Sequence, residues 1–270
     1  MHWFDIGVNL TNQRFDIEPV LKRAGEAGVE SILITGTSVD ESHSALEICQ
    51  QYSNSLYCTA GVHPHHASEF NQQSYAALFN LCQHPNVLAV GECGLDFNRN
   101  FSSPEQQLHA FEQQLILASE LQLPVFLHER DAFAEQITLL KKYRKSLTGG
   151  VVHCFTGDVV QMRAYLELDL YIGITGWLCD PIRGEALRDA VLELPLERLM
   201  LETDAPYLRP KGLAKNRLVD HGNNEPAYLP YIAGQLANIM ELDMQTIKQH
   251  SYINSQTLFG LGSQEPYHAN

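Results

Sequence analysis

Four residues with metal-binding side chains each lie near the carboxyl end of an apolar run. With the run that carries each one, they are Glu92 (87–94), His128 (123–130), His153 (150–157) and Asp204 (198–207). Each run resembles a buried strand that becomes polar at its end, and in parallel α/β proteins that end of the strands carries the chemistry. Two imidazoles and two carboxylates form a mixed ligand set for a divalent cation. The pattern therefore predicts a metal-assisted hydrolase.

This ligand set suits Zn²⁺, Mn²⁺, Co²⁺ or, with more oxygen and water ligands, Mg²⁺. A site with few protein ligands leaves positions open for water and substrate, which is typical of a catalytic metal. The cation would activate water and stabilise charge on an attacked phosphoryl or carbonyl oxygen. Asp204 has a second interpretation, because at the end of the last strand it could act as the general base. A single such residue could equally be a core histidine or a helix cap, but four at equivalent positions favour a metal site.

Three further residues are candidates for substrate binding. His63 and His65 follow the third apolar run in the segment GVHPHH, and they could bind metal, hold phosphate or donate a proton. We expect both to contact substrate. Arg130 comes two residues after His128 and could clamp a phosphate through two hydrogen bonds, or pair with Asp131 to support the loop.

A cationic segment follows the eighth apolar run. It contains Arg209, Lys211, Lys215 and Arg217. At the mouth of a barrel these cations could track an anionic polymer backbone, although an ordinary solvated loop is an equal alternative. Trp177 and Phe155 could offer faces for stacking bases, but such aromatic residues are more often part of the core.

Eight strand-like runs alternate with amphipathic segments. The strands are expected at 3–10, 29–36, 55–62, 87–94, 123–128, 150–154, 170–175 and 198–202. Helices are expected at 17–27, 40–52, 104–121, 132–144 and 159–167, and more after Glu225. Such alternation predicts βαβ units, and eight of them predict a TIM-like (β/α)₈ barrel. An open doubly wound sheet is the alternative, but neither a GxGxxG fingerprint nor a P-loop is present to support it.

The composition limits the class of protein. The 270 residues suit one barrel domain, expected at 1–262 and followed by a solvated tail at 263–270. No apolar run approaches the roughly 20 residues that span a bilayer, and the first residues do not resemble a signal peptide. None of the six cysteines forms a CxxC pair, so we expect free thiols and a cytoplasmic protein. A net charge of −14 argues against a stable sequence-specific DNA binder, but not against an enzyme that holds nucleic acid briefly.

Several motifs carry a family resemblance. GVHPH, GECGLDF, PVFLHERD, VVHCFTG and LMLETDAPYL occur in this order, and Asn224-Glu225-Pro226 follows them. In these motifs the chain resembles the TatD family of metal-dependent deoxyribonucleases, within the amidohydrolase superfamily. The resemblance implies that Glu92, His128 and His153 bind the metal and that Asp204 is a ligand or the catalytic base. It also implies 3′→5′ exonuclease activity on single-stranded DNA and RNA, which would be the nucleic-acid partners of the chain.

The first strand departs from the family pattern. Many relatives have Asp-x-His-x-His there, whereas this chain has Asp5-Ile6-Gly7-Val8-Asn9. Gly7 offers no ligand and Asn9 is a weak one, so the number of metal ions is open. The same departure characterises the branch closest to TatD itself.

The expected function is therefore a metal-dependent nuclease, with Mg²⁺ as the first choice of cation and Mn²⁺ or Zn²⁺ as alternatives. We expect a monomer with no obligate protein partner. DNA repair and nucleic-acid turnover are both open as biological roles. The alternative reading is a small-molecule amidohydrolase or deaminase that uses the same metal site on an amide or lactone. A non-catalytic binding module is a third reading, which the acidic net charge disfavours.

Overall fold

The computed structural model describes residues 2–52, 56–213 and 222–261. Eight parallel strands form one sheet in the order of the sequence. They are β1 (Trp3–Val8), β2 (Val29–Ile34), β3 (Leu56–Ala60), β4 (Val87–Asp96), β5 (Val125–Arg130), β6 (Gly150–Val152), β7 (Tyr171–Ile174) and β8 (Leu199–Leu201). A parallel bridge between Val8 and Ala205 brings the two edges together. The (β/α)₈ barrel predicted from the sequence is therefore confirmed.

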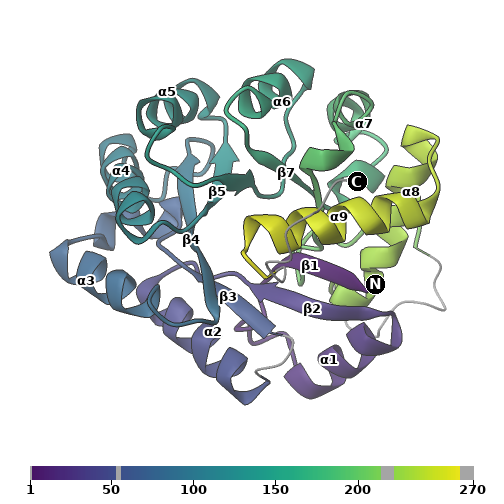
Figure 1. The fold of residues 1–270 in the computed structure, drawn as a ribbon, viewed down its shortest axis with the longest axis horizontal. Coiled ribbons are helices and arrows are strands. Elements are labelled where there is room, and N and C mark those ends of the chain that lie inside the picture. Colours follow the sequence, from purple (N-terminus) through teal and green to yellow (C-terminus); the bar gives the residue numbers. More distant parts are fainter. Residues whose placement is uncertain (1, 53–55, 214–221, 262–270) are drawn as a thin grey trace, which may run out of the picture.

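Helices surround the strands, as Figure 1 shows. They are α1 (Ile17–Glu26), α2 (Val39–Gln51), α3 (Gln72–Leu81), α4 (Pro104–Leu121), α5 (Phe133–Tyr143), α6 (Val159–Leu166), α7 (Glu185–Val191), α8 (Leu229–Met240) and α9 (Met244–Leu258). Those at the five expected ranges agree within a few residues. None of the helices in the described ranges is both long and apolar enough to cross a bilayer.

The N-terminal end of the barrel is covered by α9, which crosses in front of the strands in Figure 1. Below it, an inner cluster that includes Phe4, Phe126, Met200 and Phe259 fills the barrel. A larger cluster lies between the strands and the outer helices. Because the N-terminal end is filled and covered in this way, a site for chemistry has room only at the opposite, C-terminal mouth.

Strands β4 and β5 extend beyond their expected ends. They stay paired through Gly94–His128 and Asp96–Arg130, so Glu92 and His128 lie inside paired strands rather than after them. By contrast β6 and β8 end at Val152 and Leu201, and His153 and Asp204 follow in the loops. The long β4–β5 pair gives the mouth one rigid wall.

The cysteines are free, as expected: four are buried, and Cys154 and Cys179 are half-buried. Two expectations fall partly or wholly on residues outside the described ranges. Of the cationic segment, Lys215 and Arg217 lie outside them, and so does the whole of the tail expected at 263–270.

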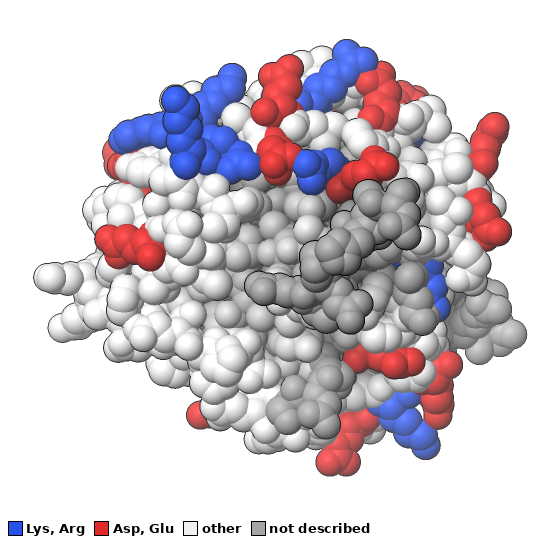
Figure 2. All heavy atoms as spheres, viewed as in Figure 1, with Lys and Arg blue, Asp and Glu red and all other residues white. Residues whose placement is uncertain are grey.

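Figure 2 shows the end of the molecule that α9 covers, with basic side chains gathered over α5. The last turn of α5 and the residues after it carry Lys141, Lys142, Arg144 and Lys145. Two of these cations already have carboxylate partners, since Lys142 pairs with Glu112 and Arg144 with Asp169. Half of the cations in this basic patch are therefore paired, and the patch belongs to the end away from the mouth.

Candidate metal centre

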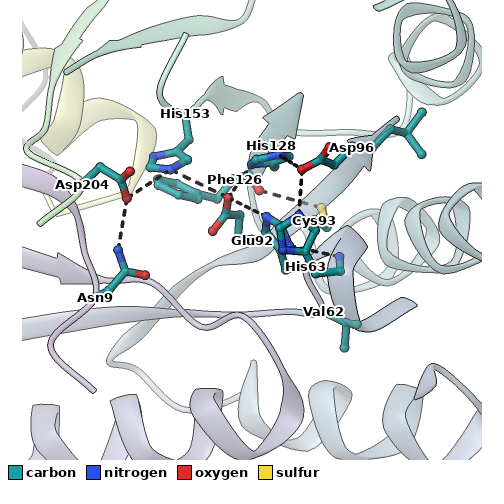
Figure 3. Close-up of polar contacts among 12 residues, drawn as sticks. Asn9, Val62, His63, Glu92, Cys93, Asp96, Phe126, His128, His153 and Asp204 are labelled. Atoms are coloured by element: carbon teal, nitrogen blue, oxygen red, sulfur yellow. Dashed lines mark hydrogen bonds and ion pairs between the residues drawn. The ribbon is translucent and has the colours of Figure 1, made fainter. Parts of the chain in front are cut away.

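Three imidazoles converge on one carboxylate oxygen at the C-terminal mouth. Oε1 of Glu92 lies 2.8 Å from His128 Nδ1, 3.5 Å from His63 Nε2 and 3.8 Å from His153 Nε2. His153 Nε2 also lies 3.9 Å from Asp204 Oδ1, so the group continues from β4 across to the segment after β8. Figure 3 shows these side chains directed toward one another, from strands β4 and β5 and from the segments that follow β3, β6 and β8.

The donor atoms fit a shared cation. Two ligands on one tetrahedral ion, each at about 2.1 Å from it, lie roughly 3.4 Å apart. His63, Glu92 and His128 each offer a ligand atom, and these atoms all lie within 4.8 Å of one another. In addition, Nε2 of His128 is buried without a hydrogen-bond partner, while Asp96 Oδ2 lies 3.6 Å from it. A buried polar atom without a partner is costly, and a cation would satisfy it.

The electrostatics of the group follow from burial and from these contacts. Burial alone would raise the pKa of Glu92, but the imidazoles of His63, His153 and His128 lower it well below its usual range. Burial opposes charge on His128, yet Asp96 and Glu92 raise its pKa to about 9. The two carboxylates of Glu92 and Asp96 therefore hold positive charge between them.

On the other side of the mouth, the pKa values of His153 and Asp204 are both raised. Burial would lower the pKa of His153, but Glu202 and Glu92 raise it to about 10. Burial raises the pKa of Asp204 to about 7, partly offset by His153. In His63, by contrast, burial lowers the pKa well below its usual value. The mouth thus contains the neutral imidazole of His63 together with several carboxylates, and a bound cation would neutralise the negative charge of those carboxylates.

Sequence reasoning overlooked the role of Glu202. This fully buried carboxylate accepts hydrogen bonds from His153 Nδ1 and from the Cys154 backbone N–H, both at 2.5 Å. It occupies the space beside Gly7, where a Cβ atom would lie within 3.0 Å of Glu202 Oε2. The absence of a side chain at Gly7 therefore makes room for the carboxylate that orients His153. The only signal in the sequence was an acidic residue directly after the apolar run LML.

Asn9 likewise has a definite role. Its amide nitrogen donates to Asp204 Oδ1 at 3.1 Å and to the Ala205 carbonyl at 3.3 Å, as Figure 3 shows for Asp204. Asp204 itself has a left-handed backbone with φ of 57°, which Asp tolerates better than most residues. Asn9, directly after the first strand, thus holds the carboxylate of Asp204, which follows the last strand.

Two glutamines of α4 position the loops on the β3–β4 side. Gln114 is fully buried, and its amide accepts from the Val62 N–H at 2.7 Å and donates to the Val62 carbonyl at 3.0 Å. Gln107 binds the backbone of Asp96 in the same way, at 2.8 and 3.0 Å. Gln114 thereby fixes the residue before His63. These glutamines were not identified from the sequence, because polar residues seven apart on a helix give no sign of burial.

The remaining predicted residues are placed differently. His65 Nε2 donates to Asp96 Oδ2 at 2.7 Å, and the ring lines the mouth beside His63. Arg130 does not line it, because its guanidinium carbon lies over the Trp177 ring, 5.5 Å from the centroid. The mouth itself is a cleft of about 480 Å³, lined by His63, Glu92, His128, His153 and Asp204 among others. That volume lies in the ordinary range for small-molecule and cofactor sites.

Comparisons with known proteins agree with this geometry. Residues 4–260 match the family model described as TatD related DNase. The chain is 50% identical to the 3′-5′ ssDNA/RNA exonuclease TatD of Erwinia amylovora, over 96% of this chain and 100% of the relative. It is 47% identical to the protein of the same name from Salmonella typhimurium, over 95% of this chain and 98% of the relative.

Solved structures give the same result. A TatD homologue from Escherichia coli, YJJV, superposes with a TM-score of 0.87 at 30% identity, covering 96% of this chain and 98% of its own. A TatD family hydrolase from Entamoeba histolytica superposes with a TM-score of 0.86, also at 30% identity and with the same coverage. With the family match spanning nearly the whole chain, this protein belongs to the TatD related DNases.

Proposed function

We propose that this protein is a metal-dependent nuclease that removes nucleotides from the 3′ end of single-stranded DNA and RNA. The observation that carries the proposal is the convergence of three imidazoles on Glu92 Oε1 at the barrel mouth, with Asp204 completing the group. The direction of digestion and the substrate are those in the names of the relatives from Erwinia and Salmonella.

Some residues of this chain would bind the cation, and others would contact the attacking water and the phosphate. Glu92 and His128 would hold the cation together with His63, because their ligand atoms lie within 4.8 Å of one another. His153 and Asp204 would complete the group, at 3.8 Å from Glu92 and 3.9 Å from His153 respectively. When bound, the cation supplies Lewis-acid stabilisation of charge on the phosphate and makes water more acidic.

Asp204 orients the attacking water and accepts its proton, because it lies just after the last strand and lines the cleft. His65, half-exposed beside His63, lines the same cleft and contacts the phosphate there. His63 is buried and neutral, and it either binds the cation or donates a hydrogen bond to the same phosphate. Arg130 contacts a phosphate farther along the bound DNA or RNA, outside the cleft.

We propose Mg²⁺ as the cation, with Mn²⁺ or Zn²⁺ as alternatives. Two carboxylates and an open cleft that admits water suit Mg²⁺, which keeps several water ligands. The imidazoles suit Mn²⁺ and Zn²⁺ equally well.

Residues 1–262 are proposed as one domain, followed by a solvated tail. We also propose that the protein is a monomer with no obligate protein partner. The free cysteines suit a reducing compartment, so we propose a cytoplasmic location.

The test uses single-stranded oligonucleotides labelled at the 3′ or the 5′ end and protein stripped of metal. Mg²⁺, Mn²⁺ or Zn²⁺ is then added back. Glu92→Gln keeps the size of the side chain but removes its charge, and we expect it to lose activity. Glu47→Ala is a matched control, because this exposed carboxylate on α2 lies outside the cleft.

Stepwise loss from the 3′ end that depends on the cation and on Glu92 would support the proposal. Digestion that starts at the 5′ end or within the strand would contradict the proposed polarity. No cleavage with any cation, together with turnover of amides or lactones, would replace the nuclease by the amidohydrolase alternative.

A further inference from the structure

Two large aromatic side chains are exposed at the edge of the metal cleft. Phe101 is 67% exposed and Tyr207 is 44% exposed, and both line the cleft that contains Glu92 and His128. Single exposed apolar residues are common on protein surfaces and need no explanation. Two aromatic rings that flank one polar cleft are a different case, because together they offer flat apolar faces beside a site for a charged group.

The two rings come from opposite sides of the barrel. Phe101 lies in the loop between β4 and α4, whereas Tyr207 lies in the segment after β8. In a closed ring of eight strands in sequence order, β4 and β8 are four strands apart, which is the largest separation. The cleft therefore has one aromatic ring on each side, with the group around Glu92 between them.

Neighbouring side chains orient both rings. Phe101 packs edge-on against His65, with the ring centroids 4.7 Å apart and the planes at 90°. The Tyr207 hydroxyl accepts a hydrogen bond from Asn12 Nδ2 at 3.1 Å, and the Arg14 guanidinium carbon lies 5.6 Å from the ring centroid. A ring that is already oriented loses little entropy when a flat ligand binds to its free face.

Unpaired cations accompany the rings. Arg99 lines the cleft close to Phe101 in sequence, and within the described ranges its exposed guanidinium forms no hydrogen bond and no ion pair. Arg14, beside Tyr207, has no carboxylate partner within those ranges either. In a chain with a net charge of −14, one unpaired cation that lines the cleft and a second beside Tyr207 at its edge indicate an anionic ligand. Aromatic faces combined with unpaired cations are the usual means of binding single-stranded nucleic acid.

We propose that Phe101 and Tyr207 stack on the unpaired bases on either side of the scissile phosphate, while Arg99 and Arg14 contact the neighbouring phosphates. This inference rests on the proposed nuclease function and adds the basis of its selectivity for single strands. Bases inside a duplex have both faces covered by their neighbours, so only an unpaired base can lie on these rings. Stacking also tolerates any sequence, because every base has a flat face.

The test measures the release of the 3′-terminal nucleotide from an oligothymidylate by Phe101→Ala and Tyr207→Ala. We expect each variant to raise KM between about 5-fold and 100-fold, with a smaller effect on kcat. Tyr207→Phe keeps the ring but loses the hydrogen bond from Asn12, so its KM should rise less than that of Tyr207→Ala. Leu192→Ala is the matched control, because Leu192 is also an exposed apolar residue but lies at the end of α7, outside the cleft.

A second substrate isolates the stacking term. An oligonucleotide whose last two residues lack bases retains the phosphates but cannot stack. On this substrate the unmodified protein and both alanine variants should have the same kcat/KM.

The outcomes separate the two proposals. If the unmodified protein degrades the oligothymidylate but the alanine variants keep its KM, or if their defect persists on the abasic substrate, stacking is refuted and the nuclease stands. If the unmodified protein degrades neither substrate, the proposed function itself fails.

Discussion

Substituting alanine for Gly7 tests whether the space beside His153 is as tightly used as the structure indicates. The new Cβ atom would lie within 3.0 Å of Glu202 Oε2 and 3.1 Å from two atoms of the His153 ring. Glu202 cannot swing aside without cost, because it is fully buried and bonded to His153 and to the Cys154 N–H. One added methyl group should therefore displace the carboxylate that orients His153.

The magnitude follows from two terms. Adding a methyl group to a well-packed interior costs about 1–3 kcal/mol. Weakening a hydrogen bond to a charged group adds about 1.5–3 kcal/mol if that bond is lost completely. We expect the free energy of unfolding to fall by about 2–5 kcal/mol in Gly7→Ala. Metal affinity should fall about 10- to 100-fold, as it does when the partner of a metal-ligating histidine is removed.

Urea denaturation and calorimetric titration with Mn²⁺ measure the two effects. Gly25→Ala is the control, because no atom lies within 4 Å of a Cβ placed at this α1 position, and it should gain up to about 1 kcal/mol. In a Glu202→Ala background the space is empty, so Gly7→Ala should cost little there. The reasoning is refuted if Gly7→Ala matches the unmodified protein in both measurements, or if its cost is the same in both backgrounds.

Two further predictions concern buried polar groups outside the metal group. Burial raises the pKa of Asp5 to about 8 from 3.8, partly offset by hydrogen bonds from Thr203, so the folded state favours the neutral carboxyl group. The contribution of this carboxyl group to stability is therefore complete below pH 4 and is lost as the pH rises toward 8. In urea titrations between pH 5 and 8, the free energy of unfolding of the unmodified protein should fall by a few kcal/mol relative to that of Asp5→Asn. Parallel plots of this free energy against pH for the two proteins would contradict the prediction. Gln114→Leu leaves the Val62 N–H and carbonyl unpaired, so the free energy of unfolding should fall by about 2–5 kcal/mol, whereas Gln73→Leu, at an exposed site on α3, should change it by less than about 0.5 kcal/mol.

The barrel was predictable from the sequence because its signal is repeated eight times. Apolar runs followed by polar residues recur eight times along the chain, and a parallel barrel collects the ends of such runs at one mouth. That argument predicted that Glu92, His128, His153 and Asp204 lie close together, although no interatomic distance was known. The ends of β4 and β5 were less predictable, because their extension depends on pairing with each other rather than on their own residues.

The supporting residues were not predictable in the same way. Glu202 takes the space that Gly7 leaves, and that complementarity exists only after strands from the two ends of the chain lie side by side. Gln114 is an ordinary polar residue of an amphipathic helix until the backbone at Val62 lies against it. The exposure of Phe101 depends equally on its surroundings, because the sequence shows an aromatic residue but not what covers it.

The cover that α9 forms over one end of the barrel has a practical consequence. His2 and Leu261 both lie at this covered end, because His2 packs edge-on against Tyr252 of α9 and Leu261 packs against the inner cluster beneath that helix. Both residues are therefore on the side of the molecule remote from the cleft. A tether joined there would fix the protein to a solid support with its cleft directed outward, so that long polymers in solution could reach the bound protein without obstruction.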